Sequence, residues 1–207
     1  MDDLTLLIPA KHEAESLPLV LDELKKYNLP ILVVLSNEDK TTIEAIKNYP
    51  CEILFQKKKG YGAALIEGIS KINTKYLCIF NADGSFNPSE LSNMYKMIQD
   101  NQFIFASRYM KNAGSDDDSF LTFIGNKIFS TFGQIFFSLN LTDILYTFIM
   151  GESAKFKEIN LINNDFRICV EIPFNVSSQK FRYKSVPSYE RKRLKGKKKV
   201  NEFKDGF

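Results

Sequence analysis

Short apolar runs alternate with helix-like segments through the first half of the chain, and this alternation restricts the possible folds more than any other feature. The apolar runs lie at residues 4–8, 31–35, 53–55, 76–80 and 103–106. Apolar side chains at helical spacing fill the intervening segments, which are residues 13–27, 41–48, 61–71 and those from Pro88 onward. Strands that alternate with helices predict an α/β fold with a mostly parallel sheet, and largely apolar strands suit a sheet covered on both faces.

The second half of the chain contains an aromatic segment at residues 119–139, where 11 of 21 side chains are large and apolar. A membrane-spanning helix needs roughly 20 nearly unbroken apolar residues. Here glycine, asparagine, lysine and glutamine interrupt the run, while Ile124, Ile128 and Phe132 keep a helical period. The segment therefore predicts one or two C-terminal amphipathic helices rather than a membrane span. The pattern leaves open whether they pack on the core or lie on a membrane surface.

Charge is distributed unevenly along the chain. Residues 1–179 carry 17 Lys and Arg against 22 Asp and Glu, whereas residues 180–207 carry 11 against 3. A basic arm on an acidic body is expected to bind phosphate on nucleic acid, anionic lipid or a small ligand, or else to remain a solvated charge run. The acidic body and the absence of an RNA-binding motif argue against nucleic acid as a partner.

Cysteine usage and the start of the chain indicate a reducing compartment. Cys51, Cys78 and Cys169 are too few and too far apart for a disulfide framework or a zinc site, and all three lie in apolar runs. We expect buried thiols. The acidic start, Met1-Asp2-Asp3, lacks the basic region and apolar stretch of a signal peptide, which predicts a cytoplasmic location.

Ligands of open α/β sheets bind beyond the carboxyl ends of the strands, so the loops there are the candidate sites. Asn81-Ala82-Asp83-Gly84-Ser85 follows one predicted strand. Its carboxylate and amide oxygens suit a divalent cation that bridges a diphosphate, although Asp-Gly pairs are also common in ordinary turns. Gly60 and Gly62 precede a predicted helix, where glycines let a phosphate approach the backbone or simply form a turn. His12, the single histidine, has no nucleophile motif nearby and is interpreted as a loop residue.

Taken in order, these segments resemble glycosyltransferase family 2, most closely its dolichol-phosphate or polyprenyl-phosphate sugar synthase branch. The resemblance covers roughly residues 4–207 and rests on the ordered series Pro9 to Glu13, Gly60 to Ala64, Asn81 to Gly84, Ser107 to Tyr109, Asp143, and Pro187 to Lys199. It implies a GT-A (Rossmann-like) nucleotide-sugar domain over residues 1–207. Residues 1–110 would bind the nucleotide sugar, and residues 111–207 would face the acceptor and the membrane and carry the basic tail.

The resemblance also implies an activity and a set of site residues. The activity is inverting, metal-assisted transfer of a hexose from a nucleotide-diphosphate sugar to a polyprenyl phosphate in cell-envelope glycan biosynthesis. The implied catalytic residues are Asp83, Arg108, Arg193 and Lys199. The implied ligands of Mg²⁺ or Mn²⁺ are Asp83, Asn81 and Ser85. The implied substrate-binding residues are Pro9, Ala10, Glu13, Ser36, Gly60, Gly62, Asn81 and Asp143.

Such a mechanism is chemically consistent with a chain that offers no histidine base. The acceptor phosphate is already an anion, and the leaving diphosphate needs only its charge neutralised by the metal and by basic side chains. The aromatic helices and the basic tail would hold the protein peripherally on the inner face of the membrane. A membrane-anchoring partner subunit is also compatible with this arrangement.

Three positions depart from the family pattern. Leu35 and Ser36 stand where relatives have two acids, although Glu38 and Asp39 follow; Asn81 replaces an aspartate; and His12 stands where asparagine is frequent. These departures keep two alternatives open. One is a degenerate nucleotide-binding or lipid-binding regulatory module without turnover, and the other is a family 2 transferase that acts on a glycan acceptor.

Overall fold

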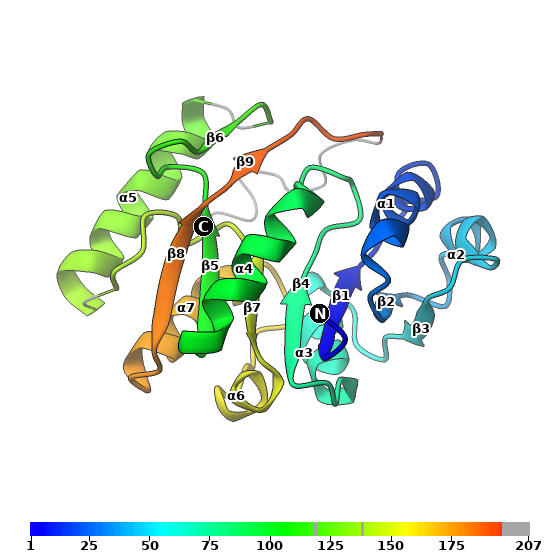
Figure 1. Cartoon of the computed structure of the whole chain (residues 1–207), viewed down its shortest axis with the longest axis horizontal. Coiled ribbons are helices and arrows are strands. Elements are labelled where there is room, and N and C mark those ends of the chain that lie inside the picture. Colours follow the sequence, from blue (N-terminus) through cyan, green and yellow to red (C-terminus); the bar gives the residue numbers. More distant parts are fainter. Residues whose placement is uncertain (118–119, 138, 196–207) are drawn as a thin grey trace.

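A seven-stranded sheet forms the centre of the computed structural model, which describes residues 1–117, 120–137 and 139–195 (Figure 1). The strand order is β3-β2-β1-β4-β7-β5-β8. Its strands are β1 (Leu4–Pro9), β2 (Ile31–Leu35), β3 (Glu52–Phe55), β4 (Tyr76–Ile79), β5 (Phe103–Ser107), β7 (Ile149–Glu152) and β8 (Tyr183–Pro187). Only β7 among them runs antiparallel to its neighbours, β4 and β5. The predicted α/β fold with a mostly parallel sheet is confirmed.

Helices cover both faces of this sheet. One face carries α1 (Leu17–Leu24), α2 (Lys40–Ile46) and α4 (Leu91–Met97), and the other carries α3 (Tyr61–Lys71), α6 (Ser153–Glu158) and α7 (Ile168–Ser178). Within β1, Leu6 and Ile8 belong to the first apolar cluster while Leu7 belongs to the second. Each strand therefore needs apolar side chains on both of its faces, which explains the apolar runs in the sequence.

Several boundaries differ from the sequence-based expectations. The helix expected over residues 13–27 begins at Leu17 and ends in a 3-10 turn at Lys25–Tyr27. The aromatic segment forms a single helix, α5 (Phe120–Phe137), which packs against α7 beside the β8 edge of the sheet (Figure 1). Of the three cysteines, Cys78 and Cys169 are buried as expected, whereas Cys51 is only half-buried.

The strand order also locates the edge at which a ligand is expected. From β1 the chain builds outward through β2 to β3, and it then returns to place β4 on the other side of β1. This reversal is the topological switch point of the sheet, and crevices at the carboxyl ends of the two strands there are the usual ligand sites. The loops after Pro9 and after Ile79 therefore flank the expected site.

Candidate functional site

The loop after β4 presents one carboxylate and uses its other polar side chains to hold its own shape. The Ser85 N–H donates to Asp83 Oδ1 at 3.0 Å. The Asn81 side-chain amide donates to Ser85 Oγ at 2.5 Å, and its oxygen accepts from the Phe86 N–H at 3.3 Å. Asn81 and Ser85, both expected as metal ligands, thus serve as internal supports of the loop. Asp83 Oδ2 is the carboxylate oxygen directed away from it.

The segment that follows β8 crosses the carboxyl end of the sheet and lies on this loop. After Pro187 it forms β9 (Tyr189–Glu190), which pairs with β6 (Gly114–Ser115), and Figure 1 shows it continuing towards the loop after β4. The Arg191 N–H donates to Ser85 O at 2.8 Å, and the Leu194 N–H donates to Asp83 O at 2.9 Å. Gly84 has a φ of +82°, and a Cβ there would lie 2.5 Å from Leu194 Cγ. Glycine is therefore required both for the turn and for the close approach.

Arg193 joins this segment to the site. Its Nη1 lies 2.8 Å from Asp83 Oδ2, and its Nη2 lies 3.0 Å from Asp117 Oδ2. Burial favours the neutral form of Arg193, but Asp83, Asp117 and Glu13 outweigh it and raise the pKa of the guanidinium. The structure thus brings together three residues expected from the sequence, Glu13, Asp83 and Arg193. It adds Asp117, whose only signal in the sequence is its place in a run of three acids.

The loops after β1 and β2 are tied together by a buried carboxylate, Asp39. Pro9 ends β1, and the N–H of the buried Ala10 donates to Val34 O at 2.9 Å. Asp39 Oδ2 accepts from the His12 N–H at 2.6 Å, and Asp39 Oδ1 caps α2 by accepting from the Thr42 N–H. Asp39 therefore fixes the path of the loop that carries Glu13.

Two other expected residues also have local partners in these loops. The N–H of Glu13 donates to Thr42 Oγ1 at 3.0 Å, and its carboxylate accepts from the Ser16 hydroxyl. Ser36 Oγ accepts from the Glu38 N–H at 3.2 Å just beyond β2. These bonds place Glu13 and Ser36 at the same edge of the sheet as Asp83.

Substitution of Asp39 by asparagine is expected to lower the free energy of unfolding by about 1–2 kcal/mol at pH 7, since a charged cap bound by three donors is lost. Burial acts to raise the pKa of Asp39, but hydrogen bonds from His12, Thr42 and Thr41 lower it overall. Because the folded-state pKa is the lower one, this stabilisation is present above the unfolded pKa, at about pH 4, and is lost as pH falls further. The difference in free energy of unfolding between the variant and wild type should therefore be smaller at pH 3 than at pH 7, as measured by urea unfolding. A difference that does not change with pH would exclude the charge as its source.

The glycines before α3 accommodate another part of the chain. A Cβ at Gly60 would lie 2.0 Å from Asn164 O, and one at Gly62 would lie 2.1 Å from Asn163 O. The Ala63 N–H donates to Asn164 O at 3.0 Å. The resemblance implies that these glycines bind substrate, and their sequence alone fits either a phosphate or a turn; the structure places the backbone of residues 163–165 against them.

Arg108 and Asp143, expected to contact substrate, form an ion pair inside the molecule. Arg108 Nε lies 2.8 Å from Asp143 Oδ2, and Arg108 Nη1 lies 3.1 Å from Glu190 Oε2. Only 8% of Arg108 and 1% of Asp143 are exposed, and the Tyr146 ring centroid lies 4.6 Å from the guanidinium carbon. Burial opposes the charge, but the two carboxylates raise the pKa of Arg108. The geometry therefore supports a structural role, which is to anchor β9, and with it the Arg193 segment, to the end of β5.

Lys199, expected as a catalytic residue, lies outside the described residues. Across residues 1–117, 120–137 and 139–195, no three histidine, cysteine or acidic side chains come close enough to enclose a metal ion.

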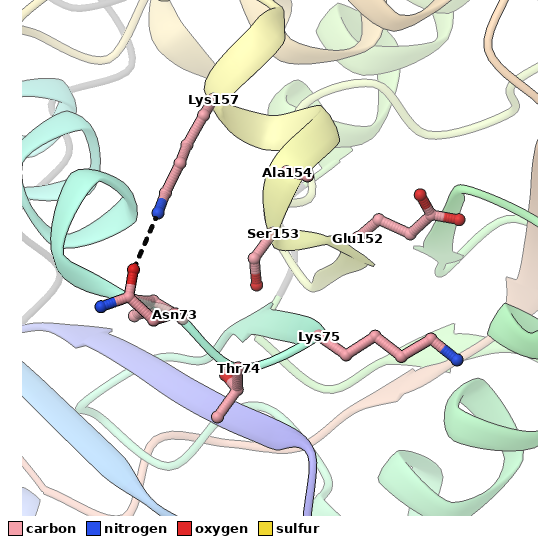
Figure 2. Close-up of a pocket in the computed structure, with 8 residues that line it drawn as sticks. Asn73, Thr74, Lys75, Glu152, Ser153, Ala154 and Lys157 are labelled. Atoms are coloured by element: carbon pink, nitrogen blue, oxygen red, sulfur yellow. Dashed lines mark hydrogen bonds between the residues drawn. The ribbon is translucent and has the colours of Figure 1, made fainter.

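Two cavities in the described part of the chain lie away from this edge. One of about 420 Å³ opens between the amino end of β4 and α6, where Lys157 bonds to Asn73 at 3.3 Å (Figure 2). A second, of about 560 Å³, adjoins it and shares Ile72 and Asn73 with the first. Neither is lined by a residue expected at the site.

The outer face of α5 is apolar and exposed. Ile135 is 69% exposed and Phe136 is 64% exposed, and Ile128, Phe129 and Phe132 extend the same surface along the helix. Isolated exposed apolar residues are ordinary, but a continuous row on one helix indicates a contact surface. In the part of the chain that the structure describes, no helix has both the length and the apolar character to cross a bilayer.

Comparison with known proteins gives concordant results at the level of family and fold. A family model described as Glycosyl transferase family 2 matches residues 5–159. Among curated proteins, an uncharacterized glycosyltransferase of Mycobacterium tuberculosis (strain H37Rv) is 26% identical over 113 residues, which cover 55% of this chain and 51% of that protein. A protein of the same description from Mycobacterium bovis matches to the same extent. The match thus spans about half the length of these relatives.

Solved structures share the architecture at low sequence identity. Glucosyl-3-phosphoglycerate synthase from Mycobacterium tuberculosis, in complex with Mn²⁺, uridine diphosphate and glucosyl-3-phosphoglycerate, superposes with a TM-score of 0.74 at 9% identity, covering 94% of this chain and 72% of that one. Mannosyl-3-phosphoglycerate synthase from Rubrobacter xylanophilus gives 0.69 at 14% identity, covering 93% and 67%. At these identities the likeness establishes the fold.

Proposed function

The chain belongs to glycosyltransferase family 2 and has the GT-A fold, and from that premise we propose that it transfers a hexose from a nucleotide-diphosphate sugar to a polyprenyl phosphate. The observation that carries the proposal is the pairing of Asp83 with Arg193 at the switch point of the sheet. A carboxylate and a guanidinium that are 110 positions apart in the sequence meet where α/β folds bind nucleotides. One suits a divalent cation, and the other suits a diphosphate.

The residues at this edge fit Mg²⁺ or Mn²⁺, the ions bound in the similar synthase structures. Magnesium is usually held by one or two carboxylates together with substrate phosphates and waters, rather than by a complete set of protein ligands. Asp83, oriented by the Ser85 N–H, can supply the carboxylate. The bound cation would neutralise charge on the leaving diphosphate. Asn81 is not needed as a ligand in this arrangement, because its side chain supports the loop.

Other residues of this chain would bind the nucleotide and orient the diphosphate. Glu13 and Ser36, at the ends of β1 and β2, would line the nucleotide pocket. Arg193 would bind the diphosphate and hold it in line with the acceptor, since a guanidinium can donate two parallel hydrogen bonds to phosphate. The acceptor phosphate is itself the nucleophile. The site therefore needs no side chain to remove a proton, in keeping with His12 serving as a loop residue.

The exposed face of α5 favours a lipid acceptor over a soluble one. One of the similar synthases, glucosyl-3-phosphoglycerate synthase, was solved in complex with phosphoglyceric acid, a small phosphorylated molecule. On this chain the row from Ile128 to Phe136 offers apolar contact to an isoprenoid chain or to the membrane that holds it. The protein would then sit peripherally on the inner face of the membrane.

Substituting Ile135 and Phe136 together by serine is expected to raise KM for a polyprenyl phosphate about tenfold or more, because two exposed apolar contacts are lost. The KM for the donor should stay unchanged. The assay measures transfer of labelled sugar from UDP-glucose or GDP-mannose to undecaprenyl or dolichyl phosphate in vesicles, with 3-phosphoglycerate as the soluble alternative acceptor.

The matched control is Ile162→Ser, which removes an equally exposed isoleucine from a different surface. An equal rise in KM for both variants would contradict the lipid acceptor. So would a wild-type enzyme that transfers sugar to 3-phosphoglycerate but not to a polyprenyl phosphate. An absence of transfer to either acceptor, with donor binding intact, would instead favour the regulatory module that Asn81 suggests.

A further inference from the structure

The guanidinium of Arg193 lies between two carboxylates that hold it in different ways. Asp83 Oδ2 lies 2.8 Å from Nη1. Asp117 Oδ2 accepts from both Nε and Nη2, at 3.1 and 3.0 Å. The contact with Asp83 can therefore be lost while the contact with Asp117 is kept.

Asp117 is itself fixed in place by the neighbouring strand pair. Its N–H donates to Ser115 Oγ at 3.1 Å, and Ser115 Oγ donates to Glu190 Oε2 at 2.6 Å. The N–H of Asp116 donates to Glu190 O at 2.9 Å. Asp117 is thus anchored to β9, the strand that leads directly into Arg193.

A divalent cation and Arg193 compete for the same oxygen of Asp83. A cation bound at Asp83 would weaken the attraction between this carboxylate and Nη1, because two positive charges would then share one carboxylate. With the bonds to Asp117 intact, the guanidinium stays within reach of the cation, and its Nη1 becomes available to an oxygen of the bridging diphosphate.

We propose that Asp117 is a positioning residue for Arg193. It holds the guanidinium at the diphosphate while Asp83 exchanges Arg193 for the metal. This role rests on the proposed function, since it presumes that a nucleoside diphosphate and a metal bind at Asp83. It makes binding of the two ligands mutually favourable: the metal frees Arg193 for the diphosphate, and the diphosphate draws Arg193 away from Asp83.

The test measures ligand binding rather than turnover. Binding of Mn²⁺ alone is followed by electron paramagnetic resonance, and binding of UDP and of GDP is followed by calorimetry with and without Mn²⁺. Arg193→Gln removes the guanidinium that competes with Mn²⁺ for Asp83. This variant should bind Mn²⁺ alone about fivefold more tightly than wild type, and it should bind the nucleoside diphosphate more weakly. Asp117→Asn should weaken binding of the nucleoside diphosphate in the presence of Mn²⁺ about tenfold, with binding of Mn²⁺ alone changed by less than about twofold.

Two further variants separate positioning from general electrostatics and from folding. Asp116→Asn removes the adjacent charge, whose carboxylate accepts from the Tyr189 hydroxyl and not from Arg193, and it should bind both ligands as wild type does. Asp117→Glu keeps the charge and should recover most of the nucleotide affinity.

The outcomes are distinguishable. Wild type that binds neither Mn²⁺ nor either nucleotide would overturn the proposed function together with this role. If wild type binds both ligands, and Asp117→Asn has the same nucleoside diphosphate affinity as Asp116→Asn, only the role of Asp117 would be overturned. Arg193→Gln that binds Mn²⁺ no more tightly than wild type would overturn the exchange at Asp83.

Discussion

Replacement of Asp83 by asparagine is expected to lower kcat/KM for sugar transfer at least about 1,000-fold, because the leaving diphosphate loses the carboxylate that would hold its neutralising cation. The fold should survive the change. Asparagine keeps an oxygen to accept from the Ser85 N–H, and the Asp83 carbonyl still accepts from Leu194. The substitution therefore removes charge from the site and leaves the loop supported.

The measurement compares initial rates for wild type, Asp83→Asn and Asp116→Asn with the labelled donors and polyprenyl phosphates described above. Thermal midpoints are recorded on the same samples. Asp116→Asn removes the same charge from a carboxylate that accepts from the Tyr189 hydroxyl, so it should keep activity within about twofold of wild type. An Asp83→Asn enzyme within tenfold of wild type would show that this carboxylate does not hold the catalytic cation.

The architecture of the first half could be predicted because its signals are local. Each strand there is an apolar run, each helix repeats its apolar side chains at helical spacing, and loops with proline, glycine or asparagine separate them. The later elements give weaker signals. The strand β7 has four residues and no alternation, and α7 contains Pro173, which ordinarily argues against a helix interior. Their places in the sheet and on its face are set by tertiary contacts.

The site shows the same division between local and distant information. The loop from Asn81 to Ser85 could be identified, since its residue types and its place after a strand are both readable. The roles of its side chains could not be predicted. The amide of Asn81 has the chemistry of a metal ligand, and only the fold shows that its oxygen also accepts from the N–H of Phe86. Likewise, glycines at 60 and 62 show that something approaches the backbone, and only the fold shows that it is the chain at residues 163–165.

Arg108 shows why a basic side chain after a strand is an ambiguous signal. An arginine in that position can point outward to a phosphate or inward to a carboxylate, and its sequence neighbourhood is the same in both cases. Its partners Asp143 and Glu190 lie 35 and 82 residues away along the chain. Their burial, which decides the matter, depends on packing that no local pattern encodes.

Replacement of Asp143 by asparagine is consequently expected to lower the free energy of unfolding by about 3–5 kcal/mol, the usual cost of removing one partner from a buried ion pair. Arg108 would keep its charge in a site nearly closed to water, with Glu190 as its remaining carboxylate partner among the contacts described here. Glu190 contacts Arg108 through one oxygen, Oε2, which also accepts from the Ser115 hydroxyl. Urea unfolding at pH 7 gives the difference directly.

The exposed pair of Arg167 with Asp165 provides the control, because it has the same chemistry and the same 2.8 Å separation but lies in solvent. Asp165→Asn should change stability little, since water screens exposed pairs. A double variant, Arg108→Met with Asp143→Asn, should cost less than the sum of the single variants, because it leaves no uncompensated guanidinium. Additive costs would show that the two side chains are not coupled. The same guanidinium also binds Glu190 in β9, the strand that leads into Arg193, so a coupled pair would belong to a buried charge network that includes this strand.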